Sequence, residues 1–163
     1  MTAYRARLTE ADIRRLVQAA DEDERAEAAH KLCRSMERVD LDEVERAAAQ
    51  KIIRLLAQDA AELVRRAMAV TLKASDLIPH DVARRLAADI DSIALPIIAS
   101  SPVFTDEDLI EIVRAGSALR QTAVAGRARV SRDVAGVVAA EAAEQAVRTL
   151  VANDNADLSE SAL

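Results

Sequence analysis

The chain has 163 residues, and its 22 Lys and Arg against 28 Asp and Glu give a formal net charge of −6 at pH 7. Hydrophobic residues make up 51% of the chain and charged residues 31%, whereas aromatic residues make up only 1%. The apolar fraction excludes a disordered chain, and three Gly and three Pro are too few for the tight turns of an all-β fold. This composition predicts an all-α fold of closely packed helices.

Apolar residues at helical spacing, together with helix caps, predict about ten helices. In the first half of the chain, a short helix follows the cap at Thr9, and a second spans residues 23–38. Asp40 is expected to cap a third helix that reaches about residue 58. Asp59 is expected to open a fourth that reaches Leu72.

In the second half, Pro79 opens a helix, and the next one covers residues 91–101 with Pro96 inside it. Since proline lacks the N–H that a helix interior needs, Pro96 should bend or end that helix. Thr105 caps a further helix that stops at Gly116. The last three are predicted over residues 119–126, 131–140 and 142–152.

Four segments share one pattern: a helix of small residues, a break, a polar cap, and an acid followed by an apolar residue. They cover residues 71–86, 97–113, 124–138 and 150–163. If Asp81, Asp108 and Asp133 are equivalent, the steps between them are 27 and 25 residues. A period of this length predicts an α-solenoid of short helical pairs.

We therefore expect one continuous domain, in which an N-terminal helical segment (1–58) leads into a repeat array (59–163). The last residues, from Ser159, look like the first turn of a helix. The array is accordingly expected to be truncated at its C-terminal end.

Roughly residues 9–163 resemble the domain of unknown function 2336 family, whose members are HEAT-like helical proteins found mainly in alphaproteobacteria, and the resemblance is most specific between Asp89 and Leu158. The resemblance is carried by SIALPIIASSPVFTDEDLIEIVRAGS, AVAGRARVSRDVAGVV and VRTLVANDNADLS, which cover residues 92–117, 123–138 and 147–159. It implies a HEAT-like α-solenoid without an assigned enzyme activity, and it carries over no catalytic residue.

Arginines are the first candidates for recognition of a partner. If the repeats stack, several of them fall near equivalent ends of consecutive helices and could form a basic ridge for an acidic peptide or phosphate. The ridge is predicted from Arg84, Arg85, Arg127 and Arg129. The other interpretation is that the arginines pair with acids of the same chain, which surface ion pairs commonly do.

The two histidines and the single cysteine have ordinary structural interpretations and one functional alternative. His30 lies on a helix that partly resembles the phosphoacceptor helix of histidine phosphotransfer domains, although Cys33 and Arg34 replace the Lys and Gly of that pattern. The alternative for His30 is a plain surface residue. His80 is expected to have a capping or surface role, and Cys33 to pack in the core.

The sequence thus predicts a non-enzymatic module that binds another protein, in bacterial signalling or regulation. No cofactor, metal, nucleic-acid or membrane partner is expected, because no motif or concentrated basic face calls for one. The absence of an apolar signal segment predicts a cytoplasmic location. Two alternatives stay open: a phosphotransfer intermediate acting through His30, and a self-associating scaffold.

Overall fold

The computed structural model describes residue 18 and residues 21–158. Within that part the chain forms nine helices, which are α2 (Glu22–Glu37), α3 (Glu43–Leu56), α4 (Glu62–Leu72), α5 (His80–Ala87), α6 (Asp91–Ser100), α7 (Asp106–Ala115), α8 (Ala118–Ala125), α9 (Arg132–Glu141) and α10 (Glu144–Val151). The only β pairing there is an isolated parallel bridge between Val130 and Ala156. The predicted all-α fold is confirmed. The helix expected after Thr9 lies outside the described residues.

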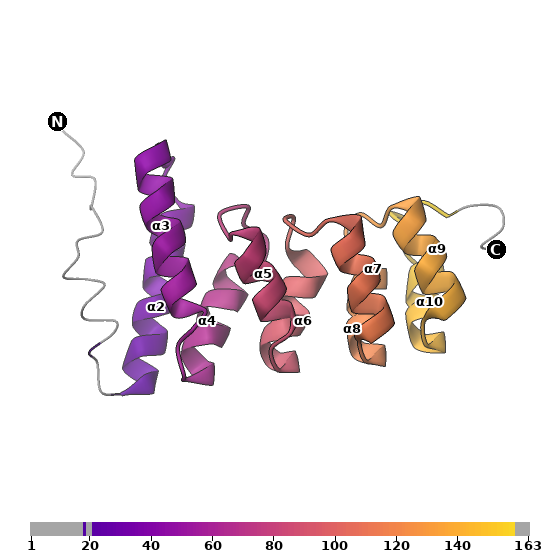
Figure 1. Ribbon diagram of the computed structural model, residues 1–163, viewed down its shortest axis with the longest axis horizontal. Helices are drawn as coiled ribbons and strands as arrows, with labels where there is room; N and C mark the ends of the chain where they lie inside the picture. Colours follow the sequence, from indigo (N-terminus) through magenta and orange to yellow (C-terminus); the bar gives the residue numbers. More distant parts are fainter. Residues whose placement is uncertain (1–17, 19–20, 159–163) are drawn as a thin grey trace.

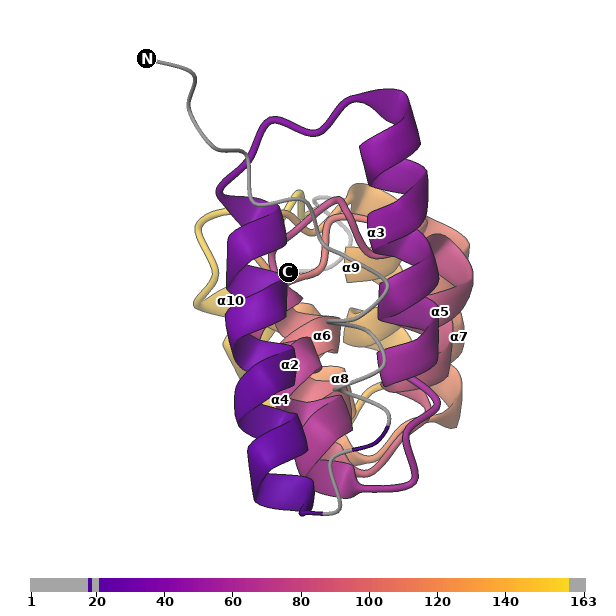
Figure 2. The same cartoon turned by 90° about the vertical axis from the view of Figure 1, so that its left-hand side faces the viewer.

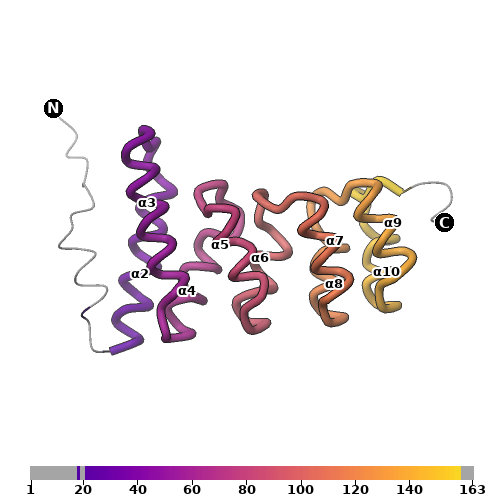
Figure 3. The backbone as a smooth tube through the Cα atoms, viewed as in Figure 1, coloured from indigo at the N-terminus to yellow at the C-terminus, as the bar shows by residue number. Residues whose placement is uncertain are grey.

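The helices stand in two rows (Figure 1). In the even row, α2 packs against α4, α4 against α6, α6 against α8 and α8 against α10. The odd-numbered helices form the second row, and the chain passes from one row to the other at every connection (Figure 3). Seen along the stack, the two rows lie side by side (Figure 2). Each helical pair therefore contacts chiefly the pairs before and after it.

The spacing of the helices is regular in the second half. The first residues of α5, α7 and α9 are 26 positions apart at both steps. The side-chain contacts keep the same register: Arg84, fifth in α5, bonds Glu111, sixth in α7, and Arg114, ninth in α7, bonds Glu141, tenth in α9. Each of these pairs spans 27 residues. Adjacent units are thus related by nearly the same step.

The described N-terminal helices differ from the rest mainly in length. α2 has 16 residues and α3 has 14, whereas the helices after them have 8 to 11. Since α2 packs against α4 in the even row, the stack continues across residue 58. The division at that residue stays a prediction.

Helix starts follow the predicted caps with two corrections. The cap of α3 is Asp42 rather than Asp40, because the Asp42 carboxylate accepts the N–H of Glu45 at 2.8 Å and Glu45 returns a bond to the N–H of Asp42. Asp59 does not open α4, which begins at Glu62; its carboxylate accepts the N–H of Ala61 at 2.8 Å within the preceding turn. The predicted cap at Thr105 is confirmed as a capping box with Asp108.

Small and aliphatic side chains fill the space between the rows. Phe104 is the single described aromatic residue of this core, and it is 9% exposed. Several alanines are fully buried, which lets neighbouring helices approach closely; they are Ala29, Ala69, Ala83, Ala94, Ala125 and Ala146. Cys33 is also fully buried, as expected, and burial raises the pKa of its thiol to about 12. None of the described helices is both long and apolar enough to cross a bilayer.

Candidate interaction groove

The four arginines of the predicted ridge fall into two separate pairs. Arg84 and Arg85 lie in the last turn of α5, next to the turn that leads into α6. Arg127 and Arg129 lie in the connection from α8 to α9, which is at the opposite end of the helices (Figure 1). They do not form one continuous ridge, because α5 and α8 belong to different rows and run in opposite directions. Partner binding by either pair stays a prediction.

Arg127 is turned into the protein. Its guanidinium donates to the carbonyl oxygens of Ile98 and Ser101 at the end of α6, and it lies over the Phe104 ring, 5.9 Å from the centroid. Burial lowers the pKa of this guanidinium. One unit further on, Asn153 donates to the carbonyl oxygens of Ala125 and Arg127, at 2.9 Å each. Both side chains thus hold the C-terminal end of the preceding even-row helix.

Arg84 and Arg85 line a groove between α5 and α7. These two helices lie in the middle of the odd row (Figure 1). The groove has a volume of about 540 Å³. α5 and α7 run in the same direction, so their last turns lie together at one end of the groove. The lining residues are Asp81, Arg84, Arg85, Ala87, Ala88, Phe104, Asp108, Glu111, Ile112, Ala115, Gly116 and Arg120.

Every acid of the groove has a cationic partner. Asp81 receives two hydrogen bonds from Arg54, at 3.3 and 3.0 Å, and these lower the pKa of its carboxyl. Glu111 receives one from Arg84 at 3.1 Å. Arg84 also lies 3.3 Å from the buried Asp108. No carboxylate of the lining is therefore left without a positive charge beside it.

Asp108 is the most constrained of the three acids. Burial alone would raise the pKa of its carboxyl, but hydrogen bonds with His80 and Thr105 outweigh burial and hold the pKa below its usual value. His80 Nε2 is 2.6 Å from Asp108 Oδ2, and the Thr105 N–H donates to the same oxygen at 2.9 Å. His80 thus joins the start of α5 to the capping box of α7.

The three arginines of the groove differ in what they bind. Arg84 is shared between Asp108 and Glu111. Arg120 uses all three nitrogens: Nε donates to Asp91 at 3.0 Å, and the two Nη groups donate to the carbonyl oxygens of Ala87 and Asp89. Arg85 is exposed and has no carboxylate within 4.0 Å among the described residues.

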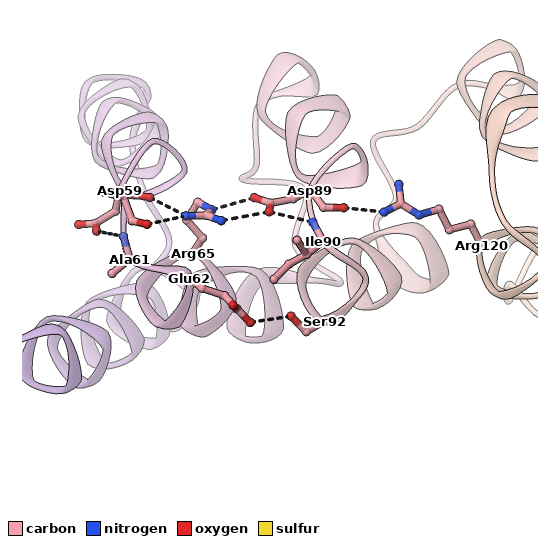
Figure 4. Close-up of polar contacts among 9 residues, drawn as sticks. Asp59, Ala61, Glu62, Arg65, Asp89, Ile90, Ser92 and Arg120 are labelled. Atoms are coloured by element: carbon pink, nitrogen blue, oxygen red, sulfur yellow. Dashed lines mark hydrogen bonds and ion pairs between the residues drawn. The ribbon is translucent and has the colours of Figure 1, made fainter.

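A chain of polar contacts crosses three successive units beside the groove (Figure 4). Arg65 of α4 grips the Asp89 carboxylate with two bonds, at 2.7 and 3.1 Å, and also donates to the backbone carbonyl of Asp59. Arg120 of α8 reaches the backbone carbonyl of the same Asp89 from the other side. The turn between α5 and α6 is thereby held by the helices on both sides of it.

This chain of contacts is the intramolecular pairing that the sequence left open for the arginines. The hydrogen bond from Arg65 is the largest cause that lowers the pKa of Asp89, and the same bond raises the pKa of Arg65. The sequence did not identify Asp89 as a partner. The sequence did contain a pattern that could have predicted such pairing. Arg54, Arg84 and Arg114 follow one another at steps of 30 residues, and each is bonded to an acid 27 residues later.

His30 lies on the exposed side of α2. Its Nδ1 is 2.7 Å from the hydroxyl of Thr71 on α4. Because Thr71 donates its own proton to the carbonyl of Ala67 at 2.6 Å, His30 Nδ1 is the donor in this pair. α2 stands at the end of the even row, and the described helices around it do not form a four-helix bundle (Figure 2). No three His, Cys, Asp or Glu side chains gather as metal ligands in the described part of the chain.

The described helices, arranged in two rows, define an all-α protein. Residues 93–163 match the profile of a bacterial family described as "Uncharacterised protein conserved in bacteria (DUF2336)". The family predicted from the sequence is therefore confirmed for this part of the chain, which begins inside α6. No curated protein and no solved structure matches the chain.

Proposed function

We propose that the protein is a non-enzymatic helical-repeat scaffold that binds another protein in the groove between α5 and α7. It acts in the cytoplasm, in bacterial signalling or regulation, and needs no cofactor. Its mechanism is presentation of shape and charge by a rigid array. The observation that carries the proposal is this groove of about 540 Å³, which combines an apolar floor with the exposed guanidinium of Arg85.

Two further features support the proposal. The turn that precedes α6 is gripped from both sides by Arg65 and Arg120, so the wall of the groove is fixed before a partner arrives. A preformed surface loses less conformational entropy on binding than a mobile one. We also propose that the stack is a HEAT-like α-solenoid, which its two rows and its constant register support.

Site-specific crosslinking in the native cytoplasm tests the proposed function. A photoreactive amino acid is placed at Ala115, which is exposed in the groove, or at Ala128, which is exposed in the α8 to α9 connection. We expect one protein to be captured from Ala115 and not from Ala128. That protein is then identified by mass spectrometry and purified.

Affinity for the purified partner completes the test. The double variant Arg84→Glu and Arg85→Glu should weaken binding at least tenfold, whereas Arg129→Glu should leave the Kd unchanged. Capture from Ala128 alone, or equal affinity of the double variant and the unmodified protein, would contradict binding in the groove. No observation in the described residues specifically favours the two alternatives, phosphotransfer through His30 and self-association.

A further inference from the structure

We infer that the groove between α5 and α7 recognises a partner segment in which an acidic side chain stands beside apolar ones, and that Arg85 binds its carboxylate. This inference rests on the proposed function and specifies the chemistry of the partner.

The first argument is the donor capacity left in the groove. Arg120 donates hydrogen bonds from all three nitrogens, to Asp91 and to two backbone carbonyls. Arg84 is bonded to Glu111 and lies close to Asp108. Arg85 has no such partner in the described structure. The pKa of Asp89 is lowered mainly by its bond with Arg65 and least by the charge of Arg85. The weak attraction between Arg85 and Asp89 therefore leaves the N–H groups of the Arg85 guanidinium available. A carboxylate can accept two parallel bonds from that guanidinium.

The second argument is the sign of the charge that the groove accepts. Asp81 and Glu111 are each bonded by an arginine of the preceding odd-row helix, and Asp108 is bonded by His80 and Thr105. A basic partner segment would meet no unpaired acid in this lining. The negative ends of α5 and α7 are also offset by basic residues in their last turns. Charge complementarity therefore selects an acidic segment.

The third argument is the surface around Arg85. At the end of the groove formed by the two last turns, the lining is Ala87, Ala88, Ala115 and Gly116. Gly116 closes α7, and a Cβ at this position would overlap the carbonyl oxygen of Ile112. Phe104 and Ile112 supply the larger apolar contacts. Small residues leave room for the side chains of a partner, and an apolar floor strengthens a charge-assisted bond by excluding water.

The test uses two pools of synthetic tetrapeptides, capped at both ends. One pool carries Glu at its second position and the other carries Gln, while the remaining positions are mixtures of Ala, Val, Leu and Phe. Binding is followed by NMR through the methyl signals of Ile112 and Ala115. We expect saturable shifts with the Glu pool, and an apparent Kd at least tenfold weaker with the Gln pool.

Two variants of the full chain locate the carboxylate. Arg85→Gln should weaken binding of the Glu pool at least tenfold. The matched control Arg129→Gln changes another exposed arginine, which lies outside the groove, and should leave the Kd unchanged. Equal affinity for the two pools, no saturable shift with either, or an unaltered Kd in Arg85→Gln would each overturn the inference. If crosslinking from Ala115 still captures a partner in that case, the proposed function stands and only the acidic specificity falls.

Discussion

Among the described ion pairs, Arg65 and Asp89 form the one in which both partners are least exposed. Their side chains are 18% and 16% exposed, and the contact between Nε and Oδ2 is 2.7 Å. A guanidinium fork on a carboxylate fixes the direction of both groups. The pair therefore contributes more to stability than the exposed pairs of the odd row, whose partners remain hydrated.

Replacement of one carboxylate oxygen measures this difference. Asp89→Asn should lower the free energy of unfolding by about 1–3 kcal/mol, because the half-buried Arg65 loses a charged acceptor. Glu141→Gln is the matched control: Arg114 also holds Glu141 with two bonds, both at 3.0 Å, but the two side chains are 57% and 43% exposed. Urea denaturation should show a clear loss for Asp89→Asn and a change below about 0.5 kcal/mol for the control. Equal losses would mean that burial does not distinguish the two pairs.

The same carboxylate predicts a pH dependence. The bond from Arg65 lowers the pKa of Asp89 in the folded protein below that of the unfolded chain, which is about 3.9. The stabilisation is therefore complete above about pH 5, falls below that as the unfolded chain binds protons, and is lost as the pH falls through the folded pKa. The urea concentration at the midpoint of unfolding should be higher for the unmodified protein than for Asp89→Asn. This difference should be largest at pH 7 and smaller at pH 3. A difference that stays constant would contradict the assignment.

Residue types could be predicted from the sequence, but their orientations could not. Pairing of arginines with acids of the same chain was one of the two interpretations of the sequence, and Arg65 holds the Asp89 carboxylate with two bonds. Arg84 and Arg85 are adjacent, so their side chains point about 100° apart on the helix. That rotation leaves Arg84 bonded and Arg85 free of ion pairs in the described structure. The partner of each arginine depends on the neighbouring unit, which local sequence does not specify.

At the scale of single helices, α6 is the unusual one because it contains Pro96. The helix was expected to bend or end near this residue, and it continues to Ser100. Proline supplies no N–H, so the carbonyl of Ser92, four residues earlier, loses its helical hydrogen bond. The fully buried Ile93, Ile97 and Ile98 compensate, because they anchor α6 in the core.

Pro96→Ala should therefore raise the free energy of unfolding by about 1 kcal/mol or more, since it restores a helical donor and removes a poor helix former. Pro102→Ala is the control, because Pro102 is exposed in the following turn and donates nothing to a helix. It should be neutral or slightly destabilising. Thermal unfolding followed by circular dichroism compares the two. A lower melting temperature for Pro96→Ala would show that the proline ring contributes packing that outweighs the missing hydrogen bond.

Helix boundaries were the feature most accurately predicted from the sequence, because caps and apolar spacing depend only on residues close together in the chain. The error at Asp59 arises because an aspartate can accept a backbone N–H group in a turn as well as at a helix start. At Asp40 the true cap, Asp42, is another aspartate two residues later. The groove was not predictable. It depends on the separation of α5 and α7, which comes from the packing of complete units.

At the scale of the whole molecule, the described helices pack more continuously along the even row than along the odd row. Each even helix packs against the next, and α7 packs against α9. α3 packs only weakly against α5, and α5 only weakly against α7; the groove lies between α5 and α7. A stack held along one row can keep such an opening without losing its core. The groove is open in this structure without a partner.

Hydrogen exchange of the purified protein, with and without the partner captured from Ala115, tests the central claim most directly. The amides that report on the groove lie in the last turns of α5 and α7, at residues 84–88 and 112–116. Binding there should slow their exchange and leave residues 127–130, near the second arginine pair, unchanged. Protection confined to residues 127–130 or to the even row, or no change at residues 84–88 and 112–116, would contradict the account.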